Sequence, residues 1–260
     1  MARYRIELTL RDPCPFELTH HEINVGGMDY RIEFDATRRS MSLSEVTGSD
    51  HQMAARSARD TANRFLNFLF ALSQFPGELE ADYKYENLDV ENDRGQVVHA
   101  GPVVGYSFQG PLPDKLDLST DRRGAAFVRR GDLARDPFDR FRNYFLAADC
   151  IGKSLTSTSD SIVIADTLSI IATPAIIESL NRCLAKVNIP NSVNFTGDPV
   201  KDINTVLYKG FRCALMHSGD TADFTPFNVG DEEMVVSALR LMRGVAWQYV
   251  KFHETTARVA

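Results

Sequence analysis

Arg212 and His217 are the two residues whose types and spacing best fit acid–base chemistry at a phosphate. A neutral imidazole accepts a proton near neutral pH, where histidine titrates in its ordinary state. A guanidinium presents a planar fork of N–H donors that matches two phosphate oxygens. We therefore take this pair as the candidate catalytic residues, with His217 as the base and Arg212 as the group that binds the anion.

Three further residues are candidates for binding. Tyr208 lies four residues before Arg212, about one helical turn away, and could position a phosphate or stack a base. Arg140 and Arg142 belong to an arginine-rich stretch, residues 121–142, that holds seven arginines and four aspartates. This stretch is either a solvated segment with some ion pairs or a strip that attracts anions.

The Arg–His spacing alone does not identify a site. With 22 arginines and six histidines in 260 residues, about one or two pairs separated by four to six residues arise by chance. Arg94 and His99 have the same spacing in an acidic turn-to-strand segment, and we interpret that pair as accidental. The alternative for Arg212 and His217 is a structural role, because cations near the last carbonyls of a helix stabilise it by about 0.3–1 kcal/mol.

The composition limits the classes of function. The formal net charge of −6 argues against a general nucleic-acid coat protein, which needs a basic face. Four cysteines without a CxxC pair are typical of buried thiols in a reducing compartment. We expect no metal site and no cofactor, because the chain has neither clustered ligands nor a glycine-rich nucleotide loop. The lack of a signal sequence and of a membrane-length apolar run predicts a cytoplasmic protein with no membrane partner.

The elements around the candidate site change character along the chain. Alternating apolar residues predict strands at 4–10, 30–34, 41–46, 81–90 and 96–108. Apolar residues at helical spacing predict one long helix from about residue 50 to 73, which Pro76-Gly77 ends. Residues 1–110 are therefore expected to form an α+β module of strands around one long helix.

A helical pattern begins at Pro137 and predicts an all-α half over residues 137–260. Helices are expected at 137–151, 162–171, 174–187, 202–216 and 231–249. Residues 111–136 contain proline and glycine and are interpreted as a linker-like segment. In an unbroken helix, Arg212 and His217 would point about 140° apart. They can converge only if the helix frays after Met216, where Ser218-Gly219-Asp220 is typical of a helix end.

The run LYKGFRCALMHSG, late in a helical half and before a long last helix, resembles the HEPN superfamily. The resemblance covers about residues 137–256 and implies a helical bundle. Many members are metal-independent ribonucleases with an arginine and a histidine separated by four to six residues, matched here by Arg212 and His217. In such members dimerisation brings two motifs into one cleft, so the resemblance implies a homodimer. The layout of an α+β module before such a bundle also resembles the methylamine-utilisation J proteins, which implies a protein partner from the same operon.

Two functions follow from the residues and the resemblance together. The first is a HEPN-like accessory or binding protein that contacts RNA or a nucleotide through Arg212 and His217. The second is a metal-independent endoribonuclease, in which His217 accepts the 2′-hydroxyl proton and Arg212 binds the phosphate that this oxygen attacks. Cys213 favours the first, because ribonuclease members carry asparagine, aspartate or histidine directly after the arginine and a thiol is a weak hydrogen-bonding group.

Overall fold

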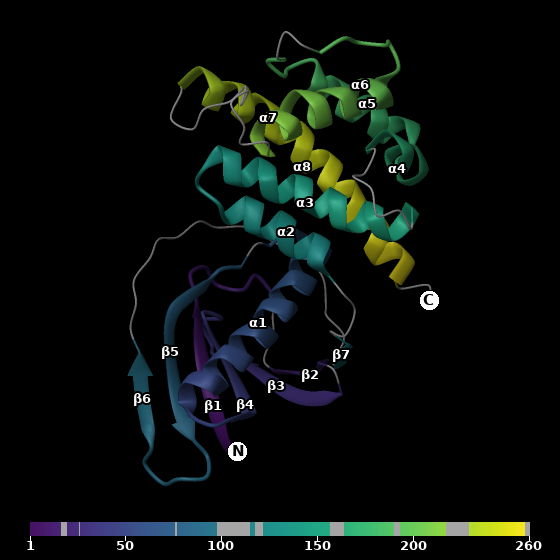
Figure 1. The fold of residues 1–260 in the computed structure, drawn as a ribbon. Coiled ribbons are helices and arrows are strands. Elements are labelled where there is room, and N and C mark those ends of the chain that lie inside the picture. Colours follow the sequence, from purple (N-terminus) through teal and green to yellow (C-terminus); the bar gives the residue numbers. More distant parts are fainter. Residues whose placement is uncertain are drawn as a thin grey trace. The chain divides into compact units, whose positions relative to one another are not determined.

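The chain divides into two compact units, Met1–Arg122 and Arg123–Ala260, which are described separately. In a computed structural model, the described residues are 1–16, 20–25, 27–75, 77–97, 115–117, 122–156, 164–189, 193–216 and 229–257. Figure 1 shows strands and one helix in the first unit and helices in the second. This confirms the predicted α+β N-terminal half and the predicted helical C-terminal half.

The first unit is a seven-stranded sheet with helix α1 (His51–Ser73) against one face (Figure 1). Its strands are β1 (Ala2–Leu10), β2 (His20–Val25), β3 (Met28–Phe34), β4 (Ser40–Gly48), β5 (Leu79–Asn87), β6 (Arg94–Val97) and β7 (Lys115–Asp117). The spatial order is β6-β5-β1-β4-β3-β2-β7, and every pairing is antiparallel except the parallel pair β2–β7. Strand β2 was not expected, and β7 lies inside the segment expected to be a linker.

Alternation along β1 explains the two faces of this sheet. Ile6, Leu8 and Leu10 are fully buried in the core that α1 closes. Asp50 starts α1 by accepting a hydrogen bond from the Met53 N–H, so the helix begins where a side chain can satisfy its first donors. The alternation of apolar residues in β1 and the Asp50 cap of α1 are both local features of the sequence. Together they favour a sheet with one apolar face that a helix covers.

The other face of the sheet is charged. Arg5 pairs with Glu33 at 3.2 Å, and the amine of Lys84 lies 2.8 Å from the Glu7 carboxylate. Arg5, Glu7 and Lys84 line a groove of about 480 Å³ together with residues of β5 and β6. Such exposed pairs contribute only about 0–1 kcal/mol each, so this face is a solvated, internally compensated surface.

The second unit is made of helices (Figure 1). They are α2 (Arg123–Leu133), α3 (Pro137–Thr156), α4 (Ile164–Ile171), α5 (Pro174–Leu184), α6 (Pro199–Asn204), the π-helix η1 (Thr205–Arg212), α7 (Cys213–Met216) and α8 (Val229–Ala257). Helix α3 packs against α2 on one side and against α8 on another. The five expected helical segments are present, with the fourth extended to residues 199–216.

Helix α2 is a correction, because it occupies residues 123–133 of the segment expected to be a linker. Its two glycines lie seven residues apart on one face, where α3 approaches closely. A Cβ at Gly131 would lie 2.5 Å from the Tyr144 ring, and one at Gly124 would lie 2.2 Å from Ile151 Cδ1. Glycines that suggested a flexible connection are therefore needed for close helix packing, which local sequence does not reveal.

A buried carboxylate joins three of these helices. Asp132 on α2 has a side chain only 6% exposed, and it accepts two hydrogen bonds from the Arg243 guanidinium of α8, at 2.7 and 2.8 Å. The Tyr144 hydroxyl of α3 donates a third, at 2.7 Å. Burial, and then the negative charge of Asp132, raise the pKa of Tyr144, so the phenol stays protonated and remains a donor.

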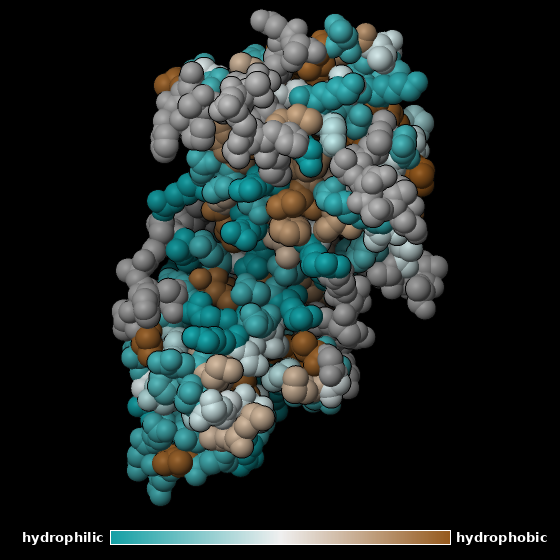
Figure 2. All heavy atoms as spheres, in the orientation of Figure 1, coloured by the Kyte–Doolittle hydropathy of each residue, from teal (hydrophilic) through white to brown (hydrophobic). Residues whose placement is uncertain are grey.

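None of the helices in the described residues has the length and apolar character needed to span a membrane. The face drawn in Figure 2 is mostly hydrophilic, with apolar side chains in small groups. Single exposed apolar residues are ordinary on a protein surface and identify no interaction site by themselves.

Asp132→Asn is expected to lower the free energy of unfolding of the helical unit by about 2 kcal/mol, because it removes the buried charge that accepts hydrogen bonds from Arg243 and Tyr144. Urea unfolding followed by circular dichroism measures this. Asp149→Asn is the control, since its pair with Lys153 on α3 is more exposed and should contribute less than about 1 kcal/mol. Equal effects of the two substitutions would contradict a central role for Asp132.

Candidate functional site

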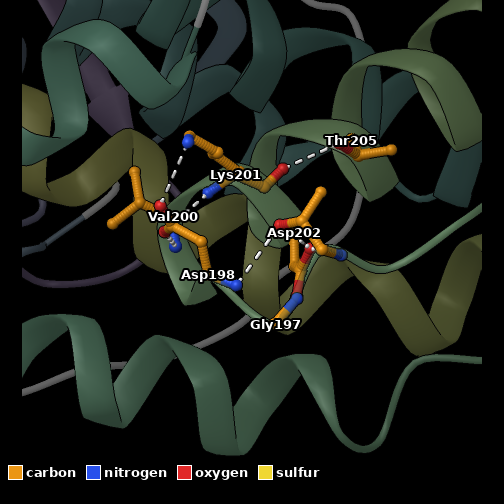
Figure 3. A network of polar contacts seen from close by, with 7 residues as sticks. Gly197, Asp198, Val200, Lys201, Asp202 and Thr205 are labelled. Atoms are coloured by element: carbon orange, nitrogen blue, oxygen red, sulfur yellow. Dashed lines mark hydrogen bonds and ion pairs between the residues drawn. The ribbon is translucent and has the colours of Figure 1, made fainter.

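The candidate site lies on the helical run formed by α6, η1 and α7. Asp198 caps its first turn by accepting hydrogen bonds from the Val200 and Lys201 N–H groups, and Pro199 occupies the first helical position (Figure 3). Asp202, one turn later, is 6% exposed. The run therefore begins at a point set by two aspartates.

Asp202 ties the preceding loop to this helix. It accepts hydrogen bonds from the Thr196 N–H at 2.6 Å, from the Thr196 hydroxyl at 2.8 Å and from the Gly197 N–H at 3.1 Å. Gly197 has a φ of +82°, a conformation that favours glycine. Burial raises the pKa of Asp202, but the hydrogen bonds outweigh it and the pKa lies below its ordinary value.

The middle of the run is a π-helix rather than the regular α-helix that was expected. Its hydrogen bonds connect residues five apart, as when the Cys213 N–H donates to the Tyr208 carbonyl. Apolar residues spaced three and four apart along the run pack into the interior: Ile203, Val206, Leu207 and Phe211 are fully buried. Each π-turn contains more residues than an α-turn, so the direction of every following side chain is rotated from its α-helical position. Short π-helical turns are often found at functional sites.

Arg212, the last residue of η1, lies over two aromatic rings. Its guanidinium carbon is 5.1 Å from the centre of the Tyr208 ring and 5.9 Å from the centre of the Phe145 ring. The two rings are themselves 6.3 Å apart and inclined by 45°. These distances are within the range of cation–π attraction, which contributes about 0.5–2 kcal/mol depending on solvation. Arg212 and Tyr208 are both half-buried, so the cluster reaches the surface.

The structure brings only some of the predicted residues together. Tyr208 and Arg212 are in contact, whereas His217 and the rejected His99 lie outside the described residues. Arg140 and Arg142 are two residues apart on α3 and so point to nearly opposite sides. Arg140 is half-buried beside the Tyr144 hydroxyl, where its hydrogen bond and charge lower the phenol pKa against the larger effects of burial and Asp132. Arg142 is exposed.

Phe145 lies in the helix expected at 137–151 but was not among the predicted site residues, and the structure places it in contact with Arg212. It is 3% exposed and presents its ring from α3 to a residue far along the chain. The helical spacing of Phe141 and Phe145 indicates a shared face, but nothing in the sequence shows what that face contacts. Arg94, of the rejected pair, forms an ion pair with Glu86 at 2.7 Å.

Metal ligands do not cluster in the described ranges: no group of three or more histidine, cysteine, aspartate or glutamate side chains there could hold a metal ion. All four cysteines are free thiols, with Cys14 buried and the other three half-buried. Burial raises the pKa of the Cys14 thiol to about 11, so this cysteine is protonated and a poor nucleophile.

Comparison with known proteins finds no protein-family model, no curated protein and no solved structure that matches this chain. The geometry of the Arg212 cluster is therefore the basis for a functional proposal.

Asp202→Asn is expected to destabilise the helical unit by about 1–2 kcal/mol at pH 7, because it removes charge-assisted hydrogen bonds. A lowered folded-state pKa contributes stability above the unfolded value, about 3.9, which is lost as the pH falls through the folded-state value. The difference between variant and wild type should therefore narrow below about pH 4. Thermal unfolding of variant and wild type at pH 7 and below about pH 4 measures this difference in stability. Asp198→Asn is the control, because asparagine is also a good helix cap.

Proposed function

We propose that the C-terminal unit is a HEPN-like bundle that binds RNA, or a nucleotide, at its phosphate through Arg212 and His217, and that the protein serves as an accessory or binding protein. The observation that carries this proposal is the Arg212 guanidinium, which two aromatic rings hold at the half-buried end of a π-helix. A planar cation with a restricted position suits an anion with two acceptor oxygens.

The distribution of charge supports the helical unit as the side that contacts a polyanion. Residues 1–122 contain 13 basic and 20 acidic residues, whereas residues 123–260 contain 16 basic and 15 acidic residues. The negative charge of the chain thus lies in the α+β unit. A local cationic site on the helical unit is compatible with the acidic total, because phosphate binding depends on the field near the site.

Arg142 is the second cation in this proposal. It is exposed on α3 and, at 100° per residue, lies about 60° around the helix from Phe145. We assign it as a second contact for the phosphates of an RNA that binds at Arg212. Arg140 lies on the other side of Phe141 and contacts Tyr144, so we assign it a structural role.

The second candidate function is a metal-independent endoribonuclease, which the five-residue step from Arg212 to His217 favours. His217 would take the proton of a 2′-hydroxyl, and that oxygen would attack the adjacent phosphorus. The bond to the 5′-oxygen would break and this oxygen would be protonated, which leaves a 2′,3′-cyclic phosphate and a 5′-hydroxyl. Arg212 would stabilise the charge that builds on the phosphate oxygens.

Arg212→Ala is expected to weaken binding of a labelled single-stranded RNA roughly tenfold, because one charge-assisted phosphate contact is lost. Fluorescence anisotropy in EDTA measures this, and the slope of log K against log salt should become shallower by about 0.7. Arg31→Ala, which removes a cation of the sheet's charged face, is the matched control and should change neither quantity. Binding by the Arg212 variant that equals the wild type would reject the proposal.

The same preparations separate binding from cleavage. Incubation of RNA with the wild type in EDTA should leave the RNA intact if the protein only binds. Fragments that end in 2′,3′-cyclic phosphate, and that disappear with His217→Ala, would instead establish the endoribonuclease. Fragments that persist in the His217 variant would indicate a contaminating nuclease.

A further inference from the structure

We propose that Phe145 is a positioning residue for Arg212, and that its ring holds the guanidinium in the orientation that binds a phosphate. This inference rests on the proposed function, because it assigns a role within the same site. Phe145 is on α3, whereas Arg212 and Tyr208 are on η1, so two separate elements make the cluster.

The contacts give the two rings different tasks. Tyr208 is one turn before Arg212 on the same helix, and it is half-buried, so its ring moves with that helix. Phe145 is 3% exposed and packs in the interior. The preceding residue on the same helix, Tyr144, is hydrogen-bonded to Asp132 of α2. The Phe145 ring is therefore a fixed surface, and it fixes the position of Arg212 relative to α3.

Fixing the guanidinium before a ligand arrives strengthens binding. A free arginine side chain samples many rotamers, and holding it in one geometry opposes association. A cation–π contact restricts these rotamers in the unbound protein, so less freedom is lost when a phosphate binds. Loss of the Phe145 ring should thus weaken the Arg212 contact without removing its charge.

Phe141 is a matched control on the same helix. It lies one turn before Phe145, is 1% exposed, and packs on Phe211 of η1 with ring centres 5.6 Å apart. Replacing either phenylalanine by leucine removes one ring from the contact between α3 and η1. Of these two phenylalanines, Phe145 is the one whose ring lies under the Arg212 guanidinium.

The experiment compares RNA binding by wild type, Phe145→Leu, Phe141→Leu, Arg212→Ala and the double variant Phe145→Leu/Arg212→Ala. Anisotropy with a single-stranded RNA in EDTA gives the affinity and its salt slope. We expect Phe145→Leu to weaken binding about three- to tenfold, while the salt slope stays near the wild-type value because Arg212 keeps its charge. The double variant should bind like Arg212→Ala alone, because Phe145 acts on the ligand only through Arg212. Phe141→Leu should lower the melting temperature but keep the wild-type affinity.

The proposal is overturned if Phe145→Leu retains the wild-type affinity, or if its effect adds to that of Arg212→Ala. An unchanged affinity in Arg212→Ala would overturn the proposed function and this inference with it. A weakened Arg212→Ala beside an unaffected Phe145→Leu would overturn only the role of Phe145. If the leucine variant does not fold, Phe145→Met fills the space with a flexible chain and is subject to the same comparison.

Discussion

A buried carboxylate organises the helical unit of this protein. Asp132 receives the fork of Arg243 and the hydroxyl of Tyr144, and these three residues come from α2, α8 and α3. A charge so deep in the protein is tolerable only with its partners in place, because its removal from water costs several kcal/mol. The requirement is directional, since all three helices must present these groups to one point. Close packing of α2 on α3 at Gly124 and Gly131 meets the same requirement.

The position of α3 also determines the candidate site. Tyr144 and Phe145 are neighbours in sequence and about 100° apart around the helix. Tyr144 is held at Asp132, and the ring of the adjacent Phe145 lies against Tyr208 and Arg212. The π-helix provides the other half of the arrangement, because its wider turn sets the direction in which Arg212 leaves the helix. The buried Asp132 network and the Arg212 cluster are thus connected through two adjacent residues of α3, Tyr144 and Phe145.

The α+β unit follows a simpler logic. Alternation along its strands separates a buried apolar face from a charged one, and a single helix closes the apolar side. The charged side pairs arginine and lysine with glutamate from other strands: Lys84 of β5 pairs with Glu7 of the neighbouring β1, and Arg5 of β1 pairs with Glu33 of β3, two strands away. The net negative charge of the chain lies in this unit, which has 20 acidic and 13 basic residues, against 15 and 16 in the helical unit.

The amino-acid sequence by itself determined what depends on neighbours along the chain. Period-two and helical spacing predicted β1, α1 and the helical run that contains Ile203 and Phe211, because burial of one face imposes those periods on the sequence. Tertiary structure alone decided the rest. The glycines of α2 allow it to pack closely on α3. In the sequence alone, the same glycines are equally typical of a linker. The π-turn and the Phe145–Arg212 contact likewise depend on how α3 and η1 pack. Because this packing joins residues more than sixty positions apart, neither feature can be predicted from local sequence.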